Sequence, residues 1–291
     1  MIVGSMTDRS IFLEGGPVGF LLIHGLGGTP AELRLVAQAL HRAGHTVYCC
    51  QLAGHCMTVD DLRKSSWQEW YASVEEAHDR LRTRCRTIVA GGLSMGGLLA
   101  IHLASRRRDD VHGLAIYAPT LVLDGWSVPW YWSYFLRWLR PVPGWRSSIM
   151  LKERPPYGLK DERIRSIVLQ HMQSGDAGVA GVFETPLHSM AQFNQFARVA
   201  RRELSVVTQP ALILHPRHDD MASIENAHYL QRHLGGIVEL VVLNDSYHMI
   251  TLDRQRQVVI DHTLALGARL AKKHAEASAP ALAAVLRNAA E

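Results

Sequence analysis

The chain has 291 residues, of which 47% are hydrophobic and 20% charged, and its formal net charge is +4. This composition indicates a folded globular protein with one large domain, or one domain carrying an insertion. The basic residues gather in short runs such as 106–108 and 201–202, with acidic residues beside them. That pattern argues against a continuous nucleic-acid-binding face, and we expect no nucleic-acid partner.

The N-terminal residues and the cysteines bear on the cellular compartment of the protein. The first ten residues contain no basic segment followed by an apolar one, and no apolar run of about 18 residues occurs. We therefore expect a cytoplasmic protein with no stable membrane insertion. No C-x-x-C pair occurs and the histidines are scattered, so we expect reduced thiols and neither a metal nor a cofactor. The four cysteines are Cys49, Cys50, Cys56 and Cys85.

Apolar segments with the length of buried strands alternate with helical patterns along the chain. The segments predicted as strands are 19–25, 45–52, 86–94, 111–119, 210–216 and 238–244. The segments predicted as helices are 30–44, 66–84, 95–107, 223–234 and one from about 252. Capping boxes, Thr29 with Glu32 and Ser66 with Glu69, open the first two helices. This alternation predicts an α/β fold with a mostly parallel, doubly wound sheet.

A long insertion separates two of the predicted strands. Residues 120–209 are helical in pattern and interrupted by prolines, which indicates a helical insertion between two strands of the sheet. Residues 1–119 and 210–270 would then form the α/β core. The alanine-rich residues 271–291 predict a C-terminal tail or an extra helix.

The stretch GGLSMGG follows the predicted strand at 86–94 and contains the pattern G-x-S-x-G around Ser94. Between a buried strand and a helix, this pattern is typical of a nucleophile held on a sharp turn. A serine hydroxyl becomes nucleophilic only when a base takes its proton. Ser94 therefore predicts an acid and then a histidine, each just after a later strand.

Both partners are present in that order. His248 follows the strand at 238–244 and is the predicted general base. Asp219 follows the strand at 210–216 and is the preferred acid, with Asp220 as the alternative and Asp245 and Asp253 as more distant ones. We therefore predict a triad of Ser94, Asp219 and His248.

An oxyanion formed at Ser94 needs backbone N–H donors. Met95 follows the nucleophile and supplies one N–H. The glycine-rich loop 24–28 after the first strand supplies the other, from Leu26, and we expect Gly25 to contact the substrate. The alternative is an ordinary glycine-rich turn.

These motifs resemble those of the α/β-hydrolase superfamily. The stretches LLIHGLGGTPAELR, QLAGH, GGLSMGG, HPRHDDM and SYHMITLD stand where that fold keeps its functional loops. They are most similar to bacterial carboxylesterases and monoacylglycerol-lipase-like enzymes. The resemblance implies an α/β-hydrolase fold, favours Asp219 over Asp220, and places Leu26 and Met95 at the oxyanion hole. It also implies that the insertion is a cap over the acyl site.

Residues 125–145 of the insertion hold five of the seven tryptophans. They are Trp126, Trp130, Trp132, Trp138 and Trp145. We expect most of them to form a small core of the cap. Trp126 and Trp130 are the candidates to line the acyl pocket or to touch lipid aggregates.

The sequence thus predicts a serine carboxylic-ester hydrolase that cleaves small or lipid-like esters of short to medium acyl chains through an acyl-enzyme. A thioesterase or an acyltransferase would use the same triad, and a ligand sensor on a hydrolase scaffold is a non-enzymatic alternative. A peptidase is less favoured. Ser94 argues against dehalogenases and epoxide hydrolases, which use an aspartate nucleophile. The sequence does not determine the oligomeric state.

Overall fold

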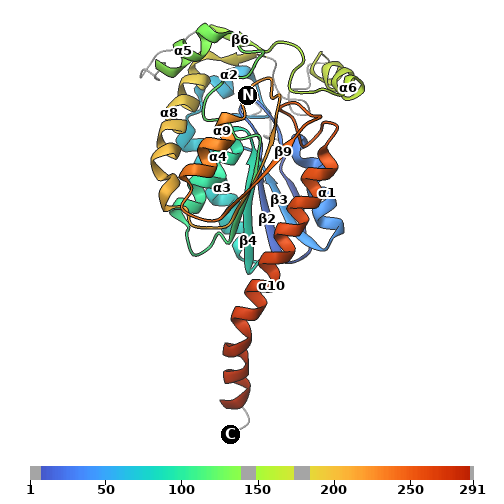
Figure 1. Ribbon diagram of the computed structural model, residues 1–291, viewed down its shortest axis with the longest axis vertical. Coiled ribbons are helices and arrows are strands. Elements are labelled where there is room, and N and C mark those ends of the chain that lie inside the picture. Colours follow the sequence, from blue (N-terminus) through green and yellow to red (C-terminus); the bar gives the residue numbers. More distant parts are fainter. Residues whose placement is uncertain (1–7, 139–148, 174–183, 289–291) are drawn as a thin grey trace, which may run out of the picture.

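The computed structural model describes residues 8–138, 149–173 and 184–288, and its centre is a seven-stranded sheet (Figure 1). The strand order is β1-β3-β2-β4-β5-β8-β9, with β1 antiparallel to β3 and the other neighbours parallel. The strands are β1 (Ile11–Leu13), β2 (Gly16–Ile23), β3 (His45–Cys50), β4 (Thr87–Leu93), β5 (Gly113–Tyr117), β8 (Ala211–Pro216) and β9 (Val238–Leu243). The predicted α/β class and mostly parallel sheet are confirmed.

Strand burial explains why the apolar runs identify the sheet. Every residue of β4, β5 and β8 is buried, as expected for strands covered on both faces. The sequence did not predict β1, because it has three half-buried residues at the sheet edge and too short a pattern to be recognised.

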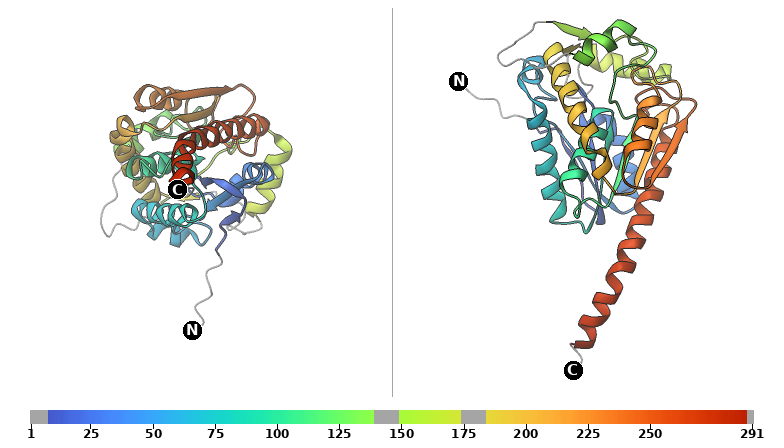
Figure 2. Two further views of the ribbon diagram at one scale, coloured as in Figure 1. Left: turned by 90° about the horizontal axis from the view of Figure 1, so that it is seen from below. Right: turned by 60° about the vertical axis from the view of Figure 1, so that its left-hand side comes forward.

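Helices cover both faces of the sheet (Figure 2). One hydrophobic core lies under α1 (Arg34–Arg42) and α10 (Arg256–Asn288). The other core lies under α3 (Trp67–Arg82), α4 (Met95–Arg106), α8 (Leu187–Glu203) and α9 (Glu225–His233). The shorter helical segments are η1 (Pro30–Leu33), α2 (Val59–Lys64) and η2 (Leu204–Val206).

Capping boxes define three helix starts. Thr29 and Ser66 each accept a backbone hydrogen bond and pair with the glutamate three residues on, which confirms both predicted boxes. Thr58 with Asp61 forms a third box, at the start of α2, that the sequence analysis did not identify. Each box satisfies backbone N–H groups that a helix start leaves unpaired.

The chain between β5 and β8 forms a layer over one end of the sheet before it returns to the core. This layer contains α5 (Trp130–Trp138), α6 (Glu162–Gln173) and an antiparallel pair, β6 (Met150–Lys152) with β7 (Glu184–Pro186) (Figure 1). Helix α8 also belongs to the predicted insertion, but its apolar side is buried in the main core beside α4. We therefore propose a cap that ends near residue 186.

The C-terminal residues continue α10 as one helix to Asn288, which extends away from the body of the protein (Figures 1 and 2). Residues 271–288 thus continue the last core helix and do not form a separate one. In the described ranges, no helix combines the length and the apolar character that a membrane span requires.

Candidate active site

Ser94 lies on a strained turn between β4 and α4. Its backbone has φ 57° and ψ −118°, a conformation that non-glycine residues adopt rarely and mostly at functional sites. Because α4 begins at Met95, the first N–H groups of that helix lack acceptors within it and lie beside the serine.

The glycines around Ser94 let this turn pack against the neighbouring strand. A Cβ at Gly96 would lie 2.0 Å from the carbonyl oxygen of Ile23, and one at Gly92 would lie 2.3 Å from the same atom. No side chain fits at either position without moving the backbone. Packing against β2 thus accounts for both glycines of the G-x-S-x-G pattern.

His248 and Asp219 form a buried pair. The His248 Nδ1–H donates to Asp219 Oδ2 over 2.8 Å, and the two residues are 7% and 3% exposed. Asp219 is held in turn by the N–H groups of Met221 and Ala222, at 2.8 and 2.9 Å from Oδ1. This geometry leaves Nε2 of His248 as the free basic atom of the ring.

The Asp219 carboxylate stabilises the protonated, positively charged form of the His248 imidazole. Burial alone would lower the pKa of His248, but the Asp219 carboxylate raises it above its ordinary value. Burial alone would raise the pKa of Asp219, but His248 and the hydrogen bonds hold it below its ordinary value. An imidazolium formed during a reaction would therefore be stabilised here.

The other candidate aspartates have different partners. Asp220 accepts the backbone N–H groups of Gly158 and His248. Asp253 accepts backbone N–H groups that include that of Tyr247, and Asp245 pairs with Lys160 and Arg254 at the surface. Of the four, only Asp219 has its carboxylate against the imidazole.

Gly25 lies beside Ser94 in the loop after β2, and Leu26, the next residue, lines the same pocket. A Cβ added to Gly25 would be 3.6 Å from the Ser94 Cβ, so the two backbones are in close contact. The Glu32 carboxylate lies inside the loop and accepts the N–H groups of Gly25 and Thr29, each over 3.3 Å. Glu32 therefore orders the loop as well as capping the helix after it.

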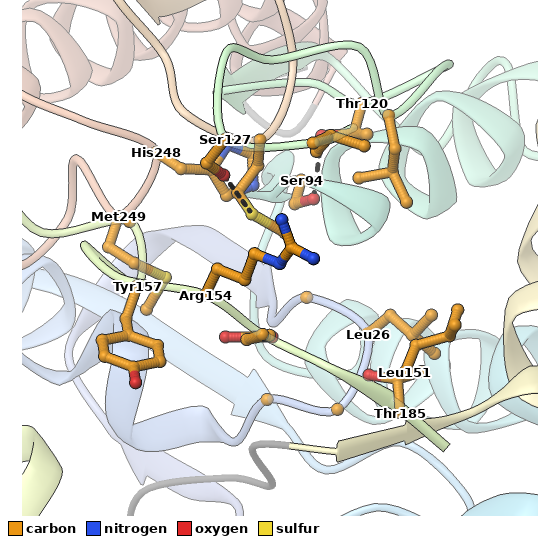
Figure 3. A pocket seen from close by; sticks show the side chains of 18 of the residues that line it. Leu26, Ser94, Thr120, Ser127, Leu151, Arg154, Tyr157, Thr185, His248 and Met249 are labelled. Atoms are coloured by element: carbon orange, nitrogen blue, oxygen red, sulfur yellow. Dashed lines mark hydrogen bonds between the residues drawn. The ribbon is translucent and has the colours of Figure 1, made fainter. Parts of the chain in front are cut away.

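These residues meet in a pocket of about 630 Å³ between the sheet end and the cap (Figure 3). Ser94, His248, Gly25, Leu26 and Met95 all line it. Its walls are mostly apolar and include Leu93, Leu123, Val128, Pro129, Trp132, Met150, Leu151, Leu159, Val168, Met190, Phe193, Met221 and Met249. An apolar cavity with few polar groups is typical of a small-molecule site.

The hydroxyl of Ser94 points to Thr120, a residue that sequence analysis missed (Figure 3). The Ser94 Oγ donates to Thr120 Oγ1 over 2.9 Å, and Thr120 Oγ1 donates to the carbonyl of Ala118 over 3.3 Å. Thr120 follows β5, where no motif marks it. In this conformation the serine proton is held by Thr120.

Among the described residues, two with carboxyl groups line the pocket, Glu32 and, in the cap, Glu153. Burial raises the pKa of each to about 7, and the nearby charges of His248 and of the other glutamate act on Glu153 as smaller effects. Arg154, next in the chain, points into the pocket toward Ser94 (Figure 3). The sequence analysis assigned Glu32 only to a capping box, and it did not identify Glu153.

The pocket corrects the expectation for the cap tryptophans. Trp126 and Trp130 are 58% and 75% exposed and are not among the lining residues, whereas Trp132 lines the wall. Trp138 is 76% exposed, so Trp126, Trp130 and Trp138 form no core of the cap. Trp145 lies outside the described residues. The short cap helix α5 turns one side to the pocket and leaves the other uncovered.

Within residues 8–138, 149–173 and 184–288, no three His, Cys, Asp or Glu side chains lie close enough to hold a metal ion. The polar side chains that line the described pocket include those of Ser94, Thr120, His248, Glu32, Glu153 and Arg154.

Comparison with known proteins identifies the family. Residues 19–255 match the family model of the serine aminopeptidases S33. The chain belongs to the serine aminopeptidase S33 family. It is 29% identical to a thermostable monoacylglycerol lipase of Bacillus sp. (strain H-257), over 87% of this chain and 91% of that protein. It is 21% identical to a carboxylesterase of Bacillus subtilis (strain 168), over 87% of this chain and 94% of that one.

Solved structures share the fold of this S33 family member. One, described with the metagenome-derived lipolytic enzymes LipS and LipT, is 26% identical, with a TM-score of 0.75 over 89% of this chain and 97% of its own. The monoacylglycerol lipase of Paleococcus ferrophilus gives a TM-score of 0.70 at 18% identity, over 91% of this chain and 98% of that one. The predicted α/β-hydrolase fold is confirmed, and the protein is a hydrolase whose relatives are esterases and lipases.

Proposed function

We propose that this protein is a serine carboxylic-ester hydrolase that acts through an acyl-enzyme, with Ser94 as nucleophile, His248 as general base and Asp219 as its acid partner. One observation carries the proposal. A serine on a strained strand-to-helix turn shares an apolar pocket with a histidine whose Nδ1 is held by a buried aspartate.

The reaction begins when the Ser94 hydroxyl turns from Thr120 to His248 Nε2 and attacks the ester carbonyl. His248 takes the serine proton, and Asp219 stabilises the imidazolium. The carbonyl oxygen becomes an oxyanion that accepts hydrogen bonds from the N–H groups of Leu26 and Met95. His248 then protonates the leaving alcohol. Water, activated by the same histidine, releases the acid from the acyl-enzyme.

A lipid-like monoester fits the pocket chemistry. The apolar wall suits an acyl chain, and the carboxyl groups of Glu32 and Glu153 offer hydrogen-bond partners to the hydroxyls of a small polyol. The 29% identical relative named as a monoacylglycerol lipase supports the same class. We therefore propose monoacylglycerols and simple esters of short to medium acyl chains as substrates.

The uncovered face of the cap supports a substrate presented in aggregates. Trp130, Tyr131, Phe135 and Trp138 of α5 are all at least half exposed. Aromatic side chains favour the interface between water and lipid, and an exposed apolar patch beside a pocket marks a binding surface. This face would bring the pocket to a lipid surface without inserting the chain.

An aminopeptidase is the second candidate, because the pocket contains carboxyl groups as well as a serine. Glu32 and Glu153 could hold the ammonium group of a peptide N-terminus when they are ionised. Their pKa values of about 7 make this ion pair incomplete near neutral pH. Thioesterase and acyltransferase activities, which need the same triad, are further alternatives.

A substrate panel separates these activities. The purified protein is given monoacylglycerols, p-nitrophenyl esters from C2 to C16, an acyl-thioester and an aminoacyl-arylamide, and initial rates are compared. We expect the highest kcat/KM on oxygen esters. Preferential cleavage of the arylamide would instead establish the aminopeptidase.

A further inference from the structure

Arg154, in the cap just after β6, is a charged residue of the pocket to which the proposed mechanism gives no task. Its side chain is exposed and extends toward Ser94 (Figure 3). Among the residues that the structure describes, no carboxylate forms an ion pair with its guanidinium. Lys152, the other lysine or arginine in the described lining, is paired with Glu184 over 3.0 Å. The described lining therefore contains one unpaired guanidinium charge.

The carboxyl groups of the pocket cancel only part of this charge. Burial raises the pKa of Glu32 and of Glu153 to about 7, so each carries its proton for about half of the time at pH 7. The Asp219 carboxylate is bonded to His248. A guanidinium, by contrast, stays protonated at any pH that a protein tolerates. An anion that enters the pocket therefore meets a permanent positive charge.

The turn that carries Arg154 lies against the loop of the catalytic histidine. The N–H of Tyr157 donates to the carbonyl of Arg154 over 3.1 Å. The next residue, Gly158, accepts the N–H of Met249 over 2.8 Å, and a Cβ added to Gly158 would be 3.3 Å from the Cβ of His248. Because His248 protonates the leaving oxygen in the proposed mechanism, the alcohol departs on this side. Arg154 therefore faces the alcohol portion of a bound ester.

We propose that Arg154 makes the pocket selective for esters of hydroxy acids, in which the alcohol portion carries a carboxylate. This inference rests on the proposed function and extends its substrates from neutral alcohols to an anionic one. The parallel N–H groups of a guanidinium match the two oxygens of a carboxylate. One unpaired cation balances the single charge of a carboxylate, whereas a phosphate monoester carries close to two. Hydrolysis releases the acyl chain as an acid and the hydroxy acid as the alcohol.

Pairs of substrates that differ only in charge test this selectivity. The butanoyl esters of glycolate and of 4-hydroxybutanoate are each compared with the corresponding neutral carboxamide, as a ratio of kcat/KM values. We expect Arg154→Gln to lower the ratio of carboxylate to amide about tenfold for at least one of the two alcohols, because a hydrogen bond to a charged group is lost. Arg154→Lys should give an intermediate ratio, because lysine keeps the charge but not the planar fork.

Arg163→Gln is the matched control for the loss of one positive charge. Arg163 is an exposed residue of α6 in the same cap and is not among the described lining residues. Its charge acts on the pocket only through solvent, so the ratio should stay within about twofold of the wild type. A second control places the carboxylate on the acyl portion. The ratio of p-nitrophenyl hemisuccinate to p-nitrophenyl butyrate should change less in Arg154→Gln than the ratios for the hydroxy acids.

Unchanged ratios for both alcohols in Arg154→Gln would overturn the proposal. The same fall in Arg163→Gln, or a larger effect on the hemisuccinate, would also overturn it. Binding by the wild type gives an independent test should Arg154→Gln fail to fold. Butoxyacetate, an ether that cannot be hydrolysed, should inhibit about tenfold more strongly than butoxyacetamide, and equal or weaker inhibition would contradict the proposal. Absence of p-nitrophenyl butyrate turnover by the wild type would instead overturn the proposed function.

Discussion

At the residue scale, the two adjacent aspartates after β8 have separate tasks. Asp219 holds the imidazole of His248, whereas Asp220 accepts backbone N–H groups from Gly158 and His248 and so joins the cap to the histidine loop. The position after the strand does not separate them, and the choice of Asp219 came from the family resemblance, because only the turn geometry decides which carboxylate reaches the ring.

Substituting each aspartate tests this division. Asp219→Asn should lower kcat about 10³- to 10⁴-fold, because the amide no longer favours the required tautomer or stabilises the imidazolium. Asp220→Asn should lower the melting temperature and retain most of kcat. Kinetics and thermal unfolding of the two variants measure both effects. A larger loss of kcat in Asp220→Asn would contradict the assignment.

Sequence patterns identify some site residues because the chemistry imposes a local motif. Ser94 is marked by glycines that close packing against the backbone around Ile23 requires, and His248 is marked by its place after a strand. Thr120, Glu153 and Arg154 carry no such signal. Thr120 follows β5 without a motif, and Glu153 and Arg154 reach the pocket through the fold of the insertion.

At the element scale, the core helices follow their sequence patterns and the cap does not. Capping boxes identify the starts of η1 and α3 in the sequence. Apolar stripes identify the helix faces that pack against the sheet. The tryptophans of α5 have a helical spacing that suggested a cap core, yet Trp130 and Trp138 are exposed. Periodicity shows which residues share a helix face but not whether that face is covered.

The exposed face of α5 should contribute to activity only on aggregated substrates. Replacing Trp130 and Trp138 by serine should lower activity on emulsified long-chain monoacylglycerol several-fold, since adsorption loses two large aromatic side chains. Activity on soluble p-nitrophenyl butyrate should stay within twofold. Ile237→Ser is the matched control, because Ile237 is 84% exposed but precedes β9, at the sheet end away from the pocket. An equal loss in that variant would contradict the role of α5.

At the scale of the whole molecule, the pocket lies where one end of the sheet meets the cap. The parallel strand order brings the residues after β2, β4, β5, β8 and β9 to one sheet end, which the sequence predicts from alternating strands and helices. The pocket volume and the position of Glu153 depend on the cap, whose fold the sequence does not specify as clearly.

The buried carboxyl of Glu153 should make stability depend on pH. Its pKa is about 7 in the folded protein and about 4.5 when exposed, so between these values the native state holds a proton that the unfolded chain has lost. Stability then falls as pH rises from 5 to 8. The raised pKa of His248 acts in the same direction as pH rises through its folded value, so the comparison must be with a variant.

Urea unfolding of wild type and Glu153→Gln at pH 5 and pH 8 measures this contribution. The fall in unfolding free energy should be smaller in the variant, by about 2 kcal/mol. An equal fall in both proteins would show that Glu153 is ionised in the folded state at pH 5.

The most direct test of the central claim is the hydrolysis of p-nitrophenyl esters by the wild type and by Ser94→Ala, measured side by side. We predict multiple turnovers by the wild type and a loss of at least about 10⁴-fold in kcat for the variant, because the nucleophile is gone while the pocket remains. A single burst without turnover in the wild type would indicate a ligand sensor. Equal rates in both proteins would contradict Ser94 as the nucleophile.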